Sequence, residues 1–110
     1  MEIIIGREQH SRKLRVIRDG KQTLAGMPGS VPMDVSRQHV SLCTTENNKW
    51  EIRNLNDKNV TYVNGVAIEK KEISESDRIE LGASHYMLSW EIIRGPKVET
   101  VDICPLKRVW

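Results

Sequence analysis

Apolar and polar residues alternate in short segments through most of the first 93 residues. At residues 40–44, 50–53 and 79–81, apolar side chains tend to fall on every second position. A period of two predicts β strands with one face against a core. Further strands are predicted where apolar and β-branched residues cluster between turn signals. These segments are residues 3–5, 13–17, 22–24, 61–63, 66–68 and 86–93.

Turn signals separate these segments. Asp19-Gly20 and Asn64-Gly65 are typical of two-residue β hairpins. Residues 69–77 are charged and turn-like, with Ile73 as a lone apolar anchor, and no segment of the first 95 residues predicts a helix. The pattern therefore predicts an all-β sandwich or barrel, with antiparallel pairing because the connections are too short for crossovers.

The chain changes character after the last predicted strand. We expect one domain over residues 1–94, followed over residues 95–110 by a linker and the start of a C-terminal segment. In that segment apolar residues recur at helical spacing, Asp102 could cap a helix, and Pro105 could lie in its first turn. A frayed tail is an equally good interpretation. We hypothesise that the chain is the N-terminal piece of a longer protein.

Composition narrows the class of protein. The 110 residues suffice for one small domain, and 17 basic against 15 acidic residues give a net charge of +2, which does not favour nucleic-acid binding. Cys43 and Cys104 lack metal-ligand spacing, so we expect free thiols in a reducing compartment and no metal or cofactor. Without a basic signal-peptide region or a run of about 20 apolar residues, we expect a cytoplasmic location and no membrane contact by this segment.

Two short motifs place residues suited to phosphate binding at strand ends. Gly6-Arg7 closes the first predicted strand, and the arginine fork can make two parallel charge-assisted hydrogen bonds to a phosphate. Ser36 precedes a strand, and its hydroxyl and backbone N–H can both donate to a phosphate oxygen. Arg37 adds a positive charge beside it. His39 can brace this loop by bonding the backbone through a ring nitrogen.

A third candidate is Asn59, whose amide can both donate to and accept from a peptide backbone. Each motif alone has a plainer interpretation: a solvated arginine, a serine that starts a strand, and a turn-forming asparagine. Asp34, Ser36 and His39 do not predict a catalytic triad, because three residues within six positions cannot easily align nucleophile, base and orienting acid. With no paired carboxylates and no phosphate-cradling glycine loop, we expect no enzyme.

Taken together and in this order, the motifs resemble the forkhead-associated (FHA) domain in a divergent, bacterial-type variant. The family pattern has Gly-Arg, then Ser-x-x-His, then a Ser-Thr-Asn-Gly-Thr-like loop leading to Asn-Gly, and an Ile-x-Leu-Gly strand. The corresponding segments here are Gly6-Arg7 and residues 36–39, 57–65 and 76–82. The resemblance extends from about residue 1 to residue 93.

The resemblance implies a two-sheet antiparallel β-sandwich of the FHA/SMAD type that binds phosphothreonine peptides at one loop end. It implies that Arg7 and Ser36 hold the phosphate, that Asn59 holds the peptide main chain, and that Arg37 and Lys58 flank them. The implied partner is a protein or peptide that contains phosphothreonine.

Four further residues take supporting roles by the same resemblance. Gly6 and His39 support the loops of the site, and Asn64 and Gly65 form the hairpin beneath it.

The chain departs from the family pattern in three places. Asp57-Lys58 replaces Ser-Thr, so an ammonium stands in for a hydroxyl, and Asp57 would repel the phosphate if it faced the site. Val60 replaces a glycine, which disfavours positive φ there. The family normally has two strands before Gly-Arg, whereas this chain starts with the Gly-Arg strand. We hypothesise that a hairpin at residues 14–24 supplies them.

Two functions follow as hypotheses. The leading one is a phosphothreonine-peptide binding module that mediates protein–protein interaction in signalling, attached to a larger signalling or envelope-associated protein. The alternative is an FHA-like interaction or oligomerisation domain that does not depend on phosphorylation. Asp57 and Lys58 motivate the alternative.

Overall fold

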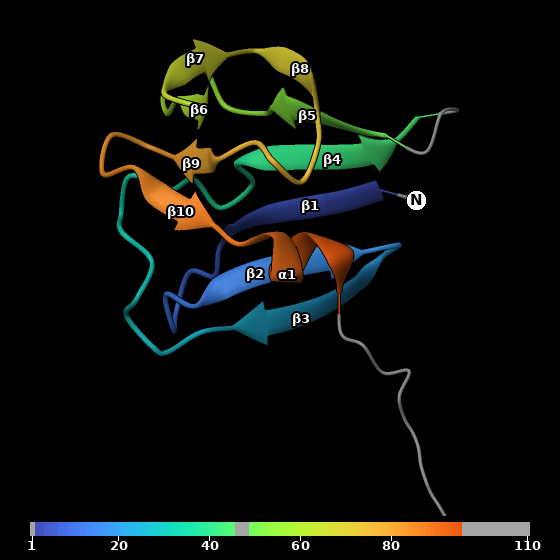
Figure 1. Ribbon diagram of the computed structural model, residues 1–110. Helices are drawn as coiled ribbons and strands as arrows, with labels where there is room; N and C mark the ends of the chain where they lie inside the picture. Colours follow the sequence, from blue (N-terminus) through green and yellow to red (C-terminus); the bar gives the residue numbers. More distant parts are fainter. Residues whose placement is uncertain (1, 46–48, 96–110) are drawn as a thin grey trace, which may run out of the picture.

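A computed structural model describes residues 2–45 and 49–95 of the chain. Within these ranges the backbone forms ten strands and one short helix (Figure 1). They are β1 (Glu2–Arg7), β2 (Leu14–Arg18), β3 (Lys21–Ala25), β4 (Val40–Thr44), β5 (Trp50–Asn54), β6 (Thr61–Val63), β7 (Val66–Ile68), β8 (Lys70–Ile73), β9 (Ile79–Leu81), β10 (Tyr86–Leu88) and α1 (Trp90–Arg94).

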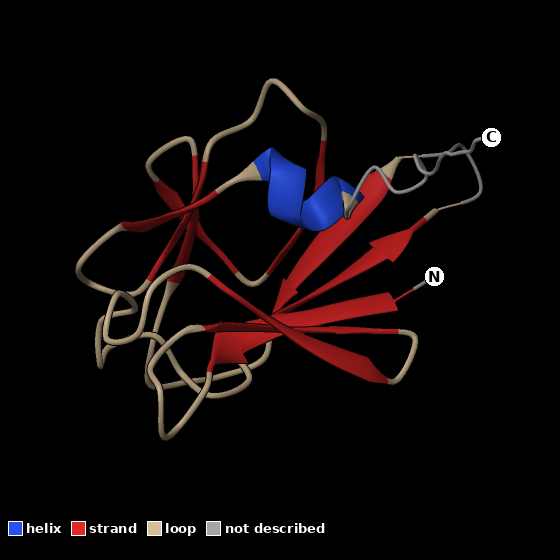
Figure 2. Ribbon diagram, turned by 90° about the horizontal axis from the view of Figure 1, so that it is seen from below, coloured by secondary structure: helices blue, strands red, loops and turns tan. Residues whose placement is uncertain are grey.

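The strands form two sheets, as the sequence predicts. Six strands pair in the order β3-β2-β1-β4-β5-β8, and four pair in the order β10-β9-β6-β7. Every one of these pairings is antiparallel. Figure 2 shows the twist of the strands and the helix beside them. The all-β, two-sheet antiparallel sandwich is therefore confirmed.

The core between the sheets is aliphatic. Ile3 and Ile5 of β1 and Leu42 of β4 are fully buried, and they meet Leu81 and Val63 of the smaller sheet in one cluster. These side chains occupy alternate positions of their strands, which is the period that sends every second residue to one face. The alternation in the sequence therefore marks the core correctly.

The β2–β3 hairpin belongs to the larger sheet. It turns at Asp19 and Gly20, which have φ of 51° and 84°. β2 pairs with β1 from Ile3↔Arg18 to Arg7↔Leu14, so the hairpin is not free of the sheet. It extends the larger sheet, whereas no strand within the described residues pairs with the outer edge of β10. Its replacement of the family's first two strands stays a prediction.

One segment expected to be a turn is a strand. Residues 70–73 form β8, which pairs with β5 at the edge of the larger sheet. Only Ile73 of this strand is buried, and the other three side chains are exposed. An edge strand with a single inward residue lacks the alternation that would identify it.

The prediction of one long strand over residues 86–93, with no helix before residue 95, is wrong. β10 ends at Leu88, and Ser89 then caps α1 because its hydroxyl accepts from the Glu91 N–H at 3.1 Å. The helix ends at Arg94 and is followed by the cap residue Gly95, whose φ is 86°. A serine cap and a C-terminal glycine outweigh the apolar run between them.

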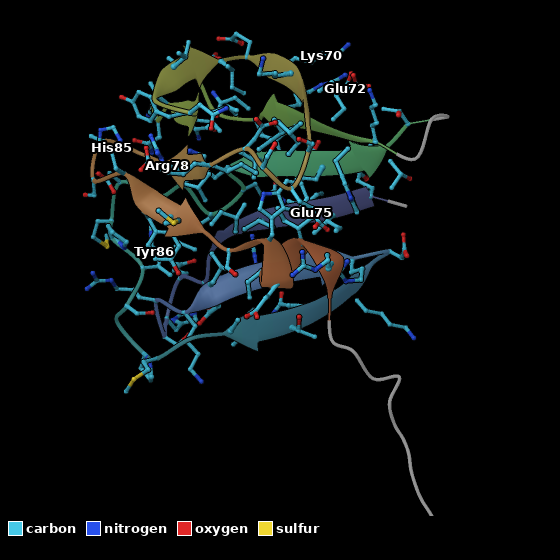
Figure 3. The ribbon with its side chains drawn as sticks, viewed as in Figure 1. Lys70, Glu72, Glu75, Arg78, His85 and Tyr86 are labelled. Atoms are coloured by element: carbon cyan, nitrogen blue, oxygen red, sulfur yellow. The ribbon has the colours of Figure 1, made fainter. Side chains whose placement is uncertain are left out.

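Contacts with distant elements hold α1 in place. The Arg18 guanidinium of β2 donates to the carbonyls of Ile92 (2.7 Å) and Ile93 (3.0 Å). Arg94 pairs with Glu75 at 3.0 Å, and Figure 3 shows Glu75 next to the helix. Among the described residues, no helix has the length and apolar character needed to cross a membrane. The helix predicted within residues 95–110 lies outside the described residues.

Candidate functional site

Loops from three parts of the sequence meet at one end of the larger sheet. The ends of β1 and β5 and the starts of β2 and β4 lie on the same side of the molecule, at the left of Figure 1. Their loops surround an open hollow of about 780 Å³. All five residues predicted to contact a phosphopeptide line this hollow: Arg7, Ser36, Arg37, Lys58 and Asn59.

Gly6 allows the loop before β4 to lie against β1. A Cβ at this position would collide with the Arg37 carbonyl oxygen and would lie 2.6 Å from that of Ser36. The close approach lets the Arg7 N–H donate to the Ser36 carbonyl at 3.0 Å. Only the absence of a side chain at Gly6 permits this contact, and the contact fixes the distance between the first two motifs.

The Arg7 side chain is held at one nitrogen and open at the others. Its Nε donates to the Val35 carbonyl at 2.9 Å. Within residues 2–45 and 49–95, the two terminal nitrogens of this guanidinium have no hydrogen-bond partner. They are the two donors that a phosphate oxygen pair would engage.

His39 joins the same loop to Val60, the residue before β6, through its two ring nitrogens. The Ser36 N–H lies 3.0 Å from Nδ1, and Nε2 lies 3.1 Å from the Val60 carbonyl. A backbone N–H can only donate, so Nδ1 accepts from Ser36, and the protonated Nε2 donates to the Val60 carbonyl. Burial lowers the pKa of His39, which favours this neutral form. The Ser36 N–H is therefore engaged, contrary to the expectation that it could donate to phosphate.

The loop before β4 and the loop between β5 and β6 meet at Ser36 and Asn59. The Asn59 amide lies 2.7 Å from the Ser36 hydroxyl. With its oxygen toward Ser36, the amide accepts the hydroxyl proton while its nitrogen donates to the carbonyls of Asp34 (3.2 Å) and Lys58 (3.3 Å). Ser36 is buried, with 8% of its surface exposed. Its hydroxyl must turn from Asn59 if it is to donate to a ligand.

Asp34 anchors the loop to the opposite sheet. Its Oδ2 accepts from the Ser84 N–H (2.6 Å) and from the Ser84 hydroxyl (2.7 Å). Its carbonyl oxygen lies 2.5 Å from where a Cβ on Gly82 would stand, so the two segments are in close contact. His39 bonds the Ser36 backbone rather than its hydroxyl. This arrangement has no acid–base–nucleophile relay.

The loop between β5 and β6 presents Lys58. Asn56 Oδ1 accepts from the backbone N–H groups of Lys58 (2.8 Å) and Asn59 (3.2 Å), which tightens the turn. Lys58 lines the hollow, whereas Asp57 is exposed and does not line it. Val60 is not among the residues with positive φ. The loop therefore adds an ammonium to the lining of the hollow, and the neighbouring carboxylate of Asp57 is not part of that lining.

Asn64 and Gly65 lie at the far end of β6 from Asn59. They form the hairpin turn with φ of 55° and 83°. The Asn64 side chain donates to Asp77 Oδ1 and accepts from the Arg78 N–H, each at 2.8 Å. The structure does not bring these two residues to the hollow, so any support they give passes through β6.

Arg15 also lines the hollow, and the sequence did not single it out. The lining residues that the structure describes include four permanent cations, from Arg7, Arg15, Arg37 and Lys58. They include one carboxylate, Glu8, whose pKa is lowered to about 2 mainly by hydrogen bonds from the hydroxyl and backbone of Ser11. The hollow is therefore strongly electropositive although the whole chain is nearly neutral.

Metal binding finds no support in the part of the chain that the structure describes. No group of three or more His, Cys, Asp or Glu side chains there could hold a metal ion. Cys43 is a free thiol, and Cys104 lies outside the described residues.

Comparison with known proteins gives one result. The family model described as the FHA domain matches residues 3–82, which include Gly6-Arg7, Ser36, His39 and Asn59. Neither a search of curated proteins nor a search of solved structures finds a match to the chain.

Proposed function

The chain belongs to the FHA domain family, whose members are generally phosphopeptide-binding modules of protein interaction. We propose on that basis that it binds phosphothreonine-containing segments of a partner protein, and that it serves signalling by this binding rather than by catalysis. We propose the cytoplasm as its location.

The observation that carries this proposal is the pairing of Arg7 with Ser36 at the hollow. Arg7, whose two terminal guanidinium nitrogens have no partner among the described residues, lines the same hollow as Ser36, and the Arg7 N–H donates to the Ser36 carbonyl at 3.0 Å. A phosphate dianion would accept both guanidinium hydrogen bonds and the hydroxyl proton. Lys58 lines the same hollow and would add a point charge.

Asn59 would hold the peptide rather than the phosphate. Its amide already bonds Ser36 Oγ at 2.7 Å, so it lies next to the phosphate position. An amide side chain can donate to one peptide carbonyl and accept from one N–H. Arg37 is exposed at the rim, where it would meet residues beside the phosphothreonine.

The supporting residues hold these binding groups in fixed relative positions. Gly6 sets how closely the Ser36 loop approaches β1, and His39 ties the same loop to Val60. In the proposal Asn64 and Gly65 shape the turn at the other end of β6. Preorganised donors lose little freedom on binding, which favours affinity.

Titration with matched peptides tests the proposal. Peptide libraries with phosphothreonine, phosphoserine or no phosphate are titrated against the wild type, Arg7→Ala and Arg53→Ala. Arg53 is an exposed cation of β5 that does not line the hollow, so it serves as the charge-matched control. We expect phosphothreonine peptides to bind best, and Arg7→Ala to weaken them by about 1.5–3 kcal/mol, or about tenfold to 150-fold.

Two results would contradict the proposal. Equal binding of all three libraries would favour the alternative, an interaction domain that does not depend on phosphorylation. If the Arg7→Ala variant binds phosphothreonine peptides as tightly as the wild type, Arg7 does not contribute to binding.

A further inference from the structure

Arg15 projects toward the hollow from the hairpin that this chain carries after Gly-Arg. It lies in β2 between the buried Leu14 and Val16, so its side chain faces away from the core. It stands directly opposite Gly6 in the β1–β2 pairing, and its Nη2 donates to the Arg37 carbonyl at 2.8 Å. The missing side chain at Gly6 brings that carbonyl within reach of β2.

Arg15 and Arg37 keep most of their donors for a ligand. Arg37 Nη1 donates to the Gln9 side-chain oxygen at 3.0 Å. Within the described residues, both guanidinium groups bond neutral acceptors, and neither forms an ion pair with a carboxylate. Each guanidinium has five N–H donors, so most of them have no hydrogen-bond partner among the described residues.

The charge of the hollow exceeds what one phosphate neutralises. A phosphothreonine carries a charge of about −1.5 to −2 near neutral pH. The four lining cations are opposed by the single carboxylate of Glu8 among the described residues that line the hollow. A surplus of positive charge therefore remains after one phosphate binds, and Arg15 and Arg37 are the cations not assigned to that phosphate.

The sheet order sets where this surplus lies. β2 is next to β1 on one side, whereas the loop bearing Lys58 and Asn59 follows β5, two strands away on the other side. Neighbouring strands lie about 4.8 Å apart and an extended peptide advances about 3.3 Å per residue. A side chain that meets Arg15 would therefore stand about one to three residues from the phosphothreonine, on the side away from Asn59.

We infer that the preferred partner carries a second anionic group one to three residues from its phosphothreonine, and that Arg15, with Arg37, receives it. The group is an aspartate or glutamate side chain, or a second phosphate. Arg15 is then a specificity-determining residue. The inference rests on the proposed function, because it describes the sequence around the same phosphothreonine.

Calorimetric titration of designed peptides tests the inference. The set contains a phosphothreonine peptide with neutral flanks, versions with one aspartate at each of the three positions on either side, and versions with phosphoserine at those positions. Each is titrated against the wild type, Arg15→Gln, Arg37→Gln and the control Arg53→Gln. For each protein, the measured quantity is the affinity of the anionic peptide divided by that of the neutral-flanked peptide.

We expect a ratio of about ten or more at one position for the wild type and for Arg53→Gln, falling toward one in Arg15→Gln. Arg37→Gln should lower the ratio in the same way. Because Arg37 lies outside β2, this result could not be caused by a local structural defect in β2. If aspartate and phosphoserine both raise the ratio, the shared anionic chemistry suffices; if phosphoserine alone does, the partner is doubly phosphorylated. A wild-type ratio near one at every position overturns the inference while leaving the proposed function intact. Absence of binding to any phosphothreonine peptide would instead overturn the proposed function.

Discussion

Replacing Gly6 with alanine adds one methyl group where β1 meets the loop before β4. The new Cβ would collide with the Arg37 carbonyl oxygen and would lie 2.6 Å from that of Ser36. Both are backbone atoms, so no flexible side chain can move aside. The loop itself must shift, and Arg7 and Ser36 then lose their mutual position.

The expected cost follows from these contacts. Overpacking a close contact costs about 1–3 kcal/mol. The shift also weakens the bonds from the Arg7 N–H to the Ser36 carbonyl and from Arg15 to the Arg37 carbonyl, each with a net contribution of about 0.5–1.5 kcal/mol. We expect the free energy of unfolding to fall by about 3 kcal/mol, and phosphothreonine-peptide affinity to fall by about tenfold or more, since 1.4 kcal/mol is a factor of ten.

The sign of the change in unfolding free energy shows whether Gly6 is a crowded position or an ordinary strand position. Gly6 is not among the glycines with positive φ. At an uncrowded site with such a backbone, alanine would stabilise the fold by about 0.4–1 kcal/mol by restricting the unfolded chain. A destabilised Gly6→Ala protein would therefore support the close contact between Gly6 and the loop before β4. A stabilised one would refute that contact.

Urea unfolding and calorimetric titration of a phosphothreonine peptide measure the two effects. The control is Gly20→Ala, at a turn residue with φ of 84°, where no described residue other than its chain neighbours has an atom within 4 Å of the Cβ position. That change should cost about 1–2 kcal/mol through backbone strain and leave the affinity unchanged. A Gly6→Ala protein with wild-type stability and wild-type affinity would show that the loop does not depend on Gly6.

Three further predictions concern other parts of the structure. Ser36→Ala removes a hydroxyl that we assign to the phosphate, so calorimetry should show affinity about tenfold to hundredfold lower; an unchanged affinity would remove Ser36 from the site. Burial lowers the pKa of His39, so stability is complete above about pH 6.5 and falls below it, because the unfolded chain binds the proton first. Urea titrations at pH 7.5 and 5.5 should show a smaller difference for His39→Gln, and an equal difference would contradict this. Arg18→Met removes donors to two carbonyls of α1, so amide exchange in α1 should accelerate while affinity is retained; unchanged exchange would show that other contacts suffice.

The sequence predicts the sandwich because its signals are local. Alternation marks the strands on both sides of the core, and Asp19-Gly20 and Asn64-Gly65 form the positive-φ turns that they indicate. β8 escapes prediction because only Ile73 faces inward. α1 escapes prediction because its apolar run continues that of β10, and only the structure identifies Ser89 and Gly95 as its caps.

Some residues of the candidate site can also be predicted from local sequence signals, and others cannot. Arg7, Ser36 and Asn59 are found by their motifs, since residue type and order suffice. Arg15 is not, because its place at the hollow depends on which residue of β2 faces Gly6, and pairing register is a long-range property. The engagement of the Ser36 N–H likewise requires the fold of the loop around His39.

The central claim is that a phosphate on threonine binds at the loop end formed by Arg7, Ser36 and Asn59. Amide chemical-shift mapping with one peptide, in phosphorylated and unphosphorylated form, tests it most directly. We predict that only the phosphorylated peptide causes saturable shifts, and that these are largest at residues 7–9, 36–38 and 56–59. Equal shifts from both peptides, or the largest shifts around Asn64 at the other end of β6, would contradict the claim.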